Sequence, residues 1–180
     1  MNLSTQSVDH PLSPKGRFGR LSYAAWTFLS SIIAMIIIVI IGFSSGILNG
    51  QNAEIPDFPL AAMIIFGIIY IIFLYLSFVF IIRRLHDRNL SGWLSLLYIV
   101  PFLNILFMIY LFCVKGTEAT NNFGPVRTTA GWEKILGWIY ILLIVASLVI
   151  AIVTVIAIPS NQEITLEKQQ TQIEQQISQA

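Results

Sequence analysis

The chain has 180 residues, of which 56% are hydrophobic and only 11% are charged, and its formal net charge at pH 7 is +1. Soluble globular domains carry about 25% charged residues, so this composition is that of an integral membrane protein. A charge balance so close to neutral creates no basic field for nucleic acid, which we exclude as a partner. Because Cys113 is the only cysteine, the chain can form neither an intrachain disulfide nor a thiolate metal cluster.

The first part of the chain leads into a membrane span. Residues 1–14 are polar and show no apolar periodicity, which predicts a flexible leader. Residues 24–41 are uncharged and apolar, and about 20 such residues form a helix that crosses a hydrocarbon core of roughly 30 Å. Between these two ranges lie basic and aromatic residues suited to the membrane surface, which form an N-terminal motif: Gly16, Arg17, Arg20 and Tyr23.

The second predicted span covers residues 60–82, which are apolar apart from two tyrosines and one serine. The loop before it, residues 48–59, contains Glu54 and Asp57 but no lysine or arginine. Lysine and arginine favour the cytoplasmic side of a membrane. We therefore expect this loop to face away from the cytoplasm and the N-terminus to be cytoplasmic.

The second span ends in the densest group of charged residues in the chain, residues 83–93, which we call the joint. Arg84 and Arg88 share one face of a helix end, where they can bind lipid phosphates or cap the last carbonyls of the span. His86 beside Asp87 could transfer protons, but a metal site needs further ligands, and the other histidine lies in the leader. We therefore expect a hydrogen-bonded structural joint with no metal ion, cofactor or catalytic residue. The residues singled out are Arg83, Arg84, His86, Asp87, Arg88, Ser91, Gly92 and Trp93.

Residues 93–114 are apolar and about one bilayer long, but Pro101 and Asn104 interrupt them near the middle. They form either a kinked third span or a re-entrant hairpin that turns at Pro101. Length and hydropathy favour the span, which leaves seven of the ten lysines and arginines on the cytoplasmic side. The hairpin leaves nine of them there, so charge favours it. With the span slightly preferred, we expect an all-α, polytopic integral membrane protein with four hydrophobic helical segments.

The rest of the chain adds a loop, another span and a tail. The loop after residue 114 is rich in turn-forming residues and could fold back on the joint. Residues 126–158 contain a linker and an additional transmembrane helix, and the glutamine-rich residues 159–180 predict a short helix outside the bilayer. The loop motif consists of Gly116, Thr117, Asn121, Phe123 and Gly124.

Three separated blocks of the chain, within residues 15–125, form one pattern. They are Gly16-Arg17-x-x-Arg20-x-x-Tyr23, Arg83-Arg84-Leu85-His86-Asp87 with Ser91-Gly92-Trp93, and Gly116-Thr117 with Asn121-x-Phe123-Gly124-Pro125. This pattern resembles the YhaH/YhaI-type family of small bacterial inner-membrane proteins. The resemblance implies a multi-pass protein of the bacterial inner (plasma) membrane, but no activity, because none is established for the family. The chain departs from the family at Asn89, where glycine is usual, although asparagine tolerates the left-handed conformation of a glycine turn.

Three classes of function agree with these features. We favour a non-catalytic membrane protein that binds lipids, especially anionic ones, or a partner, which is a second copy or another membrane protein. A small transporter or channel subunit is an alternative, although transporters usually place charged residues within a span, and the four segments have none. The third class is a membrane enzyme that acts on lipid headgroups, with His86 and Asp87 as its base.

Overall fold

The computed structural model describes residues 10–44 and 60–178 of the chain. The predictions for residues 1–9 of the leader and for the loop at 48–59 lie outside these ranges. The described secondary structure is helical, as expected for the all-α class. It consists of α1 (Arg20–Ser44), α2 (Leu60–Asp87), the 3-10 helix η1 (Gly92–Ile99), α3 (Leu103–Cys113) and α4 (Gly131–Ser178).

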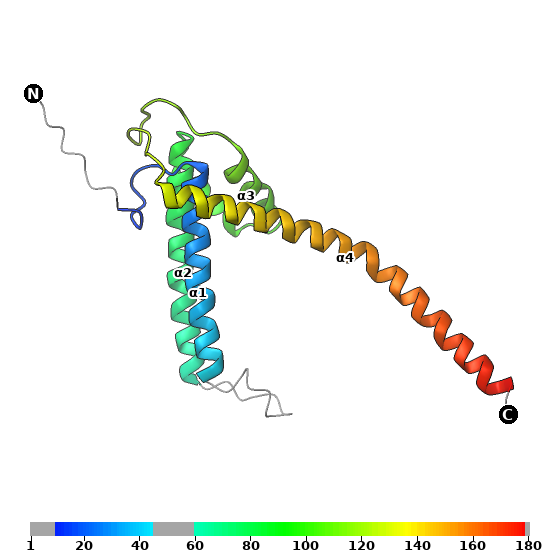
Figure 1. Ribbon diagram of the computed structural model, residues 1–180. Helices are drawn as coiled ribbons and strands as arrows, with labels where there is room; N and C mark the ends of the chain where they lie inside the picture. Colours follow the sequence, from blue (N-terminus) through cyan, green and yellow to red (C-terminus); the bar gives the residue numbers. More distant parts are fainter. Residues whose placement is uncertain (1–9, 45–59, 179–180) are drawn as a thin grey trace, which may run out of the picture. The chain divides into compact units, whose positions relative to one another are not determined.

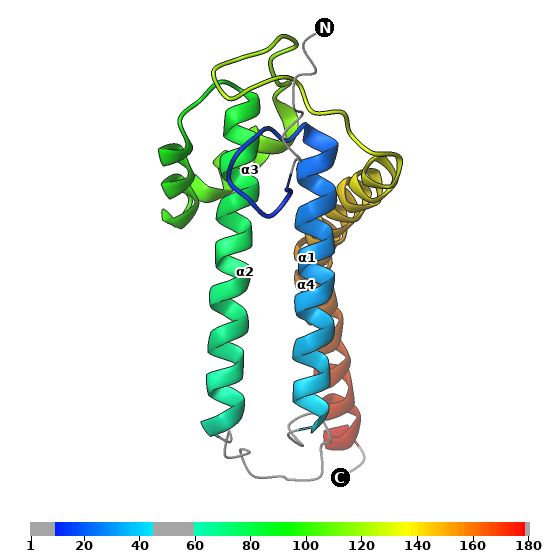
Figure 2. The same cartoon turned by 90° about the vertical axis from the view of Figure 1, so that its left-hand side faces the viewer.

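Helices α1 and α2 lie side by side and antiparallel (Figures 1 and 2). Their 25 and 28 residues correspond to about 38 and 42 Å at 1.5 Å per residue, which exceeds a hydrocarbon core of roughly 30 Å. Three helices of the described ranges are long and apolar enough to cross a membrane: α1, α2 and residues 131–157 of α4. A multi-pass membrane protein is therefore supported, and we call the end of the α1–α2 pair where α1 begins and α2 ends the joint end.

The third predicted segment is not one helix. It consists of η1 and α3, separated by residues 100–102. Pro101 has no N–H to donate, and Phe102 has a positive φ of 65°, which is unusual for an aromatic residue. Helix α3 has 11 residues, or about 16 Å, too short to cross the hydrocarbon core. A membrane crossing by residues 93–114, which would make four spans in all, thus stays a prediction.

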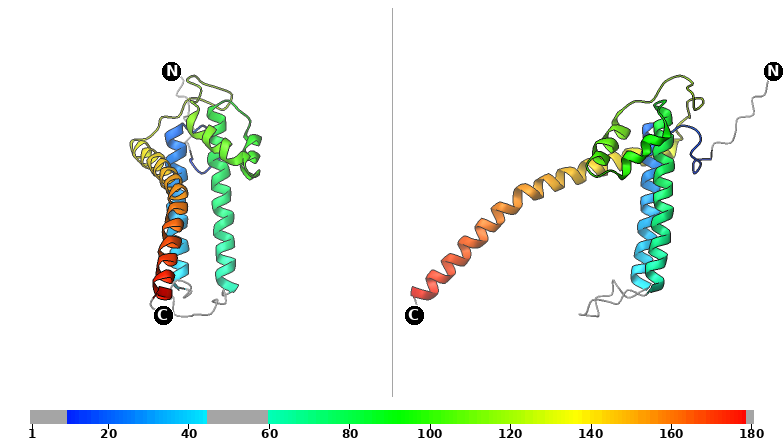
Figure 3. Two further views of the ribbon diagram at one scale, coloured as in Figure 1. Left: turned by 90° about the vertical axis from the view of Figure 1, so that its right-hand side faces the viewer. Right: turned by 180° about the vertical axis from the view of Figure 1, so that it is seen from behind.

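Both ends of this segment lie beside the last turn of α2 (Figure 3). At its start, the Leu90 N–H donates to the Leu85 carbonyl oxygen at 3.0 Å. Beyond its end, the Thr117 N–H donates to the Asp87 carbonyl oxygen at 2.8 Å. The chain therefore leaves α2 at the joint end and returns to the same end after α3.

The buried core also lies at the joint end. Phe18 and Phe80 pack with ring centroids 6.0 Å apart, and Tyr23 packs on Phe112 at 5.0 Å. Beyond the core, the apolar side chains of the helices are largely exposed, as expected for surfaces that face lipid. The core consists of Phe18, Tyr23, Val79, Phe80, Ile81, Leu85, Phe107 and Leu111.

Helix α4 belongs to two compact units of the chain, residues 1–140 and residues 141–180. It continues through the tail, where the sequence predicts a separate helix beginning after Pro159. A helix that is already nucleated extends at little cost into residues with good helix propensity, such as the Gln and Glu residues of the tail. The additional span and the tail helix therefore form one helix of 48 residues.

Candidate functional site

Asp87 lies at the centre of a buried group of charges at the joint end. Its Oδ1 accepts hydrogen bonds from Arg17 Nε at 3.2 Å and Arg17 Nη2 at 3.0 Å. Its Oδ2 accepts one from Arg84 Nη1 at 2.6 Å. Arg17 is 1% exposed, Arg84 0% and Asp87 5%. Ion pairs so well shielded from water resist screening, and removing one partner would leave a buried charge uncompensated.

Arg17 also holds the loop motif in place. Its Nη2 donates to the carbonyl oxygen of Thr117 at 2.5 Å and to Thr117 Oγ1 at 2.9 Å. Its Nη1 donates to the carbonyl oxygens of Ala119 at 2.8 Å and Gly124 at 3.1 Å. The guanidinium group from the N-terminal motif therefore joins the joint to the loop, and the three motifs form one cluster.

Arg84 attaches the end of α3 to α2. Its Nε donates to the Leu111 carbonyl oxygen at 2.8 Å, its Nη1 to that of Phe18 at 3.4 Å, and its Nη2 to that of Val114. The carbonyls at a helix C-terminus have no partner within the helix, so a buried cation there is favourable. Arg84 thus binds carbonyls at the end of α3, and not those of its own helix as expected from its position.

Arg83 fixes the segment that precedes α1. Its Nη1 donates to the carbonyl oxygens of His10 at 3.0 Å, Ser13 at 3.1 Å and Lys15 at 2.6 Å. Its guanidinium carbon lies 4.1 Å from the centroid of the Phe18 ring, an additional cation–π contact. The end of the predicted leader is therefore attached to α2.

His86 and Asp87 face different partners. The His86 ring stacks on Phe123 with centroids 3.8 Å apart and an angle of 7° between the planes. Its Nδ1 lies 3.3 Å from the Gly16 carbonyl oxygen, while Asn121 Nδ2 donates to the His86 carbonyl oxygen at 2.8 Å. The loop thus folds over the joint, and the two neighbouring side chains take part in separate sets of contacts.

Gly116 is needed because the Asp87 carboxylate packs against its backbone. A Cβ atom at this position would lie 1.8 Å from Asp87 Oδ2 and 2.5 Å from its Cγ. Asn89 has φ 57°, so the left-handed turn expected for it is present, and its Oδ1 accepts from the Asn122 N–H at 3.2 Å. The small residue Gly116 and the left-handed backbone conformation of Asn89 therefore let the loop approach the end of α2 closely.

The other predicted residues lie around this cluster. Arg20 is exposed and donates to the Cys113 carbonyl oxygen at 3.2 Å, and Arg88 donates to the Tyr110 hydroxyl at 3.4 Å. Ser91 caps η1 by accepting from the Trp93 N–H. The remaining residues are buried Tyr23, half-buried Gly92 beside Ile82, and Trp93, which is 80% exposed.

A second polar cluster, not predicted from the sequence, attaches the start of α4 to α1. The buried Glu133 carboxylate accepts from Arg127 Nη1 and Nη2 at 2.8 and 2.7 Å, and from Trp26 Nε1 at 2.7 Å and Ser22 Oγ at 3.0 Å. It also accepts from the Ala130 N–H at 3.0 Å, which is half of a capping box. In the sequence, an acidic residue at the third position of a predicted helix, as Glu133 is, could have indicated this cluster.

Two further observations concern metal binding and the surface of the loop. Among the described residues, no group of three or more His, Cys, Asp or Glu side chains could hold a metal ion. At the surface of the loop, Lys115 forms an ion pair with Glu118 and lowers the pKa of that carboxyl below its ordinary value. Both side chains are exposed, so solvent screens this pair and it adds little stability.

Comparison with known proteins identifies relatives of the part of the chain that contains the three motifs. Residues 11–125 match a family described as protein of unknown function (DUF805). The inner membrane protein YhaH of Escherichia coli K12 is 32% identical over 112 residues, 62% of this chain and 84% of that protein. The inner membrane protein YhaI of the same strain is 32% identical over 109 residues, 61% of this chain and 80% of that protein.

No solved structure matches the chain. The family match ends at residue 125, so it includes Arg17, Asp87 and the loop motif but not Glu133 or α4. The part of the chain that matches is thus the part that forms the buried cluster around Asp87. Because this match covers more than half of the sequence, the chain belongs to the DUF805 family of proteins of unknown function.

Proposed function

We propose that the protein is a non-catalytic inner-membrane protein that contacts anionic phospholipid on the cytoplasmic side. One observation carries the proposal: the three motifs meet in one buried cluster at the joint end, where Arg17 and Arg84 are engaged by Asp87 and by backbone carbonyls. Such a cluster supports a structural role for the motifs. The lipid contact then belongs to the exposed side chains around it.

The position of the hairpin supports three spans and not four. Because the segment of η1 and α3 begins and ends at the joint end, it turns back without crossing. Of the ten Lys and Arg residues of the chain, only Lys168 then lies beyond the last span, and nine share the side of the joint. This distribution agrees with a cytoplasmic joint end. The tail is then periplasmic.

The surface of the hairpin supports insertion into one leaflet. Trp93 is 80% exposed and Phe102 is 84% exposed, and other large apolar side chains of η1 and α3 are exposed beside them. Irregular backbone exposed to lipid is not stable within the hydrocarbon core, and Trp prefers the interface. The turn at residues 100–102 therefore belongs near the headgroups, with the apolar side chains directed into the acyl region.

The charge around the cluster supports anionic headgroups as the partner. A basic residue close to an anionic membrane surface contributes about 1 kcal/mol. The donors of the buried arginines are directed at the protein, so the cations that can reach lipid are the exposed ones, of which Arg20 and Lys115 also have exposed partners within the protein. We call these exposed cations the basic rim: Lys15, Arg20, Lys115 and Lys134.

Catalysis is not favoured by the surroundings of His86 and Asp87. One face of the His86 ring is covered by Phe123, and both oxygens of the Asp87 carboxylate are bound by guanidinium groups, those of Arg17 and Arg84. A general base needs access to its substrate. If the protein were an enzyme that uses His86, replacing His86 with Ala would abolish turnover and leave insertion intact.

Two experiments test the proposal. Reporters active only in the periplasm or only in the cytoplasm, fused after Ala180, should indicate a periplasmic terminus. A cytoplasmic terminus would mean that residues 93–114 cross the membrane, and the hairpin would be refuted. In the second experiment, the four rim residues are changed to Gln, and phosphatidylglycerol that copurifies with the protein is measured. Its amount should fall relative to wild type and to a control in which Lys and Arg are exchanged at the same positions. Equal recovery from all three proteins would remove the lipid role.

A further inference from the structure

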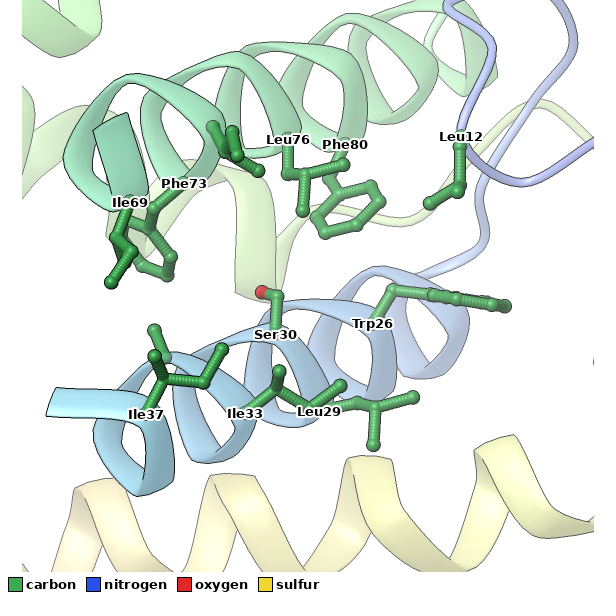
Figure 4. Close-up of a pocket in the computed structure, with 12 residues that line it drawn as sticks. Leu12, Trp26, Leu29, Ser30, Ile33, Ile37, Ile69, Phe73, Leu76 and Phe80 are labelled. Carbon is green, nitrogen blue, oxygen red and sulfur yellow. The ribbon is translucent and has the colours of Figure 1, made fainter. Parts of the chain in front are cut away.

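An elongated groove lies between α1 and α2, next to the core (Figure 4). It has a volume of about 310 Å³ and is lined by apolar side chains of both helices and by Leu12. The one hydroxyl in the lining, from Ser30, donates to the Thr27 carbonyl oxygen at 2.9 Å. The lining contains no charged side chain, and its one hydroxyl is already hydrogen-bonded within α1. An apolar occupant fits this surface.

The length of the groove corresponds to one leaflet. Along α1 its lining runs from Trp26 to Ile37, and the eleven steps between these residues rise about 16 Å in a helix. Half of a hydrocarbon core of roughly 30 Å is about 15 Å. The groove begins near the joint end, where Trp26, Phe80 and Leu12 approach one another (Figure 4). An acyl chain from the leaflet on the joint side would match this length and direction.

A cation lies close to the joint end of the groove. Lys15 follows Leu12 by three residues and is exposed. The segment that carries both residues is held on α2 by the bonds from Arg83 to His10, Ser13 and Lys15. Its position therefore does not depend on a lipid. A phosphate attached to an acyl chain in the groove would lie on the side of the protein that carries Lys15 and the rest of the basic rim. The charge of the rim and the shape of the groove therefore both favour an anionic phospholipid.

We propose that the α1–α2 groove binds one acyl chain of an anionic phospholipid from the joint-side leaflet, with its phosphate near Lys15. This proposal rests on the lipid contact of the proposed function, but it assigns a stoichiometric site to a surface outside the hairpin. Most lipid around a membrane protein exchanges freely. A lipid in this groove would be retained because its chain is enclosed on two sides by α1 and α2.

The first test fills the groove. Ala34 lines it, and Ala34→Phe would occupy the space of the acyl chain. Ile36→Phe is the matched control, because Ile36 is exposed and outside the lining. Delipidated proteins in mild detergent are titrated with dioleoyl phosphatidylglycerol, and bound lipid is counted by native mass spectrometry. Wild type and Ile36→Phe should retain one lipid, and Ala34→Phe should bind it at least tenfold more weakly. Equal retention by Ala34→Phe would overturn the groove site.

The second test leaves the groove unchanged, so it applies even if Ala34→Phe does not fold. In a protein whose other tryptophans are replaced by Phe, Trp26 fluorescence is measured with brominated phosphatidylglycerol. Quenching should saturate near one equivalent and be reversed by unbrominated lipid. Quenching that only follows the bulk lipid fraction would overturn the proposal. A groove filled by α4 or by a second copy of the chain would also overturn it. Either occupant would be detected as rapid disulfide formation, by Ala34→Cys with a cysteine introduced on α4 or between two Ala34→Cys chains.

The tests separate this proposal from the one on which it rests. If the rim variant loses bulk phosphatidylglycerol while Ala34→Phe retains its single lipid, the groove site fails and the proposed function stands. If the rim variant retains the wild-type amount of copurified phosphatidylglycerol, the proposed function fails. Lys15→Gln should weaken binding of phosphatidylglycerol but not of neutral dioleoyl phosphatidylcholine, and an equal effect on both lipids would overturn the assignment of the phosphate.

Discussion

Replacing Gly116 with Ala should break the buried cluster without removing any of its charged groups. The added methyl would lie 1.8 Å from Asp87 Oδ2 and 2.9 Å from Oδ1, so the carboxylate must move. This movement lengthens its bonds of 3.0 Å from Arg17 and 2.6 Å from Arg84, so at least one of them is lost. Separating a buried charge from its partner costs about 3–5 kcal/mol. Because Asp87 can retain part of one contact, we expect a loss of about 3 kcal/mol.

The assay is thermal unfolding in mild detergent, followed by intrinsic fluorescence. For a chain of this size about 1 kcal/mol corresponds to a shift of roughly 2–4 °C, so the midpoint should fall by roughly 6–12 °C. Gly131→Ala is the matched control, since nothing lies within 4 Å of the Cβ it would add, and its midpoint should be unchanged or slightly higher. A Gly116→Ala protein as stable as this control would refute the position of the Asp87 carboxylate.

Three other substitutions test other contacts of the structure. Arg17→Lys cannot reproduce the paired bonds of a guanidinium group, so the loop should lose about 2 kcal/mol of stability and its native-state proteolysis should accelerate roughly 30-fold. Arg20→Lys is the control and should be cleaved at a rate near that of wild type. Equal rates for the two variants would contradict the link between the motifs. Glu133→Gln should lower the unfolding midpoint by several degrees, for a loss of about 2 kcal/mol, whereas exposed Lys134→Gln should not. A similarly small shift of the unfolding midpoint in both variants would contradict the second cluster. Phe123→Ala should speed diethyl pyrocarbonate modification of the joint histidine several-fold, since a stacked pair contributes about 0.5–1.5 kcal/mol. The leader histidine is the internal control, and unchanged rates at both would contradict the stack.

The spans and the position of the charged motifs could be predicted from the sequence because they depend on local properties. A continuous apolar range such as residues 60–82 forms a helix in lipid, where no water is available to bind its backbone. The break at Pro101 was also visible, since proline cannot donate a backbone hydrogen bond. The relation to a family followed from residues in all three motifs, such as Arg17, Asp87 and Thr117.

Only the tertiary structure decided which of these groups meet. Arg17 binds Asp87 across 70 residues and Thr117 across 100, and no periodicity or hydropathy value specifies such a pair. The same applies to Glu133, whose acceptor role depends on Trp26 from another helix. Whether residues 93–114 return to the joint is also decided by contacts, because Arg84 binds the end of α3. Hydropathy measures only transfer into lipid, whereas the direction of the chain depends on where buried donors find their acceptors.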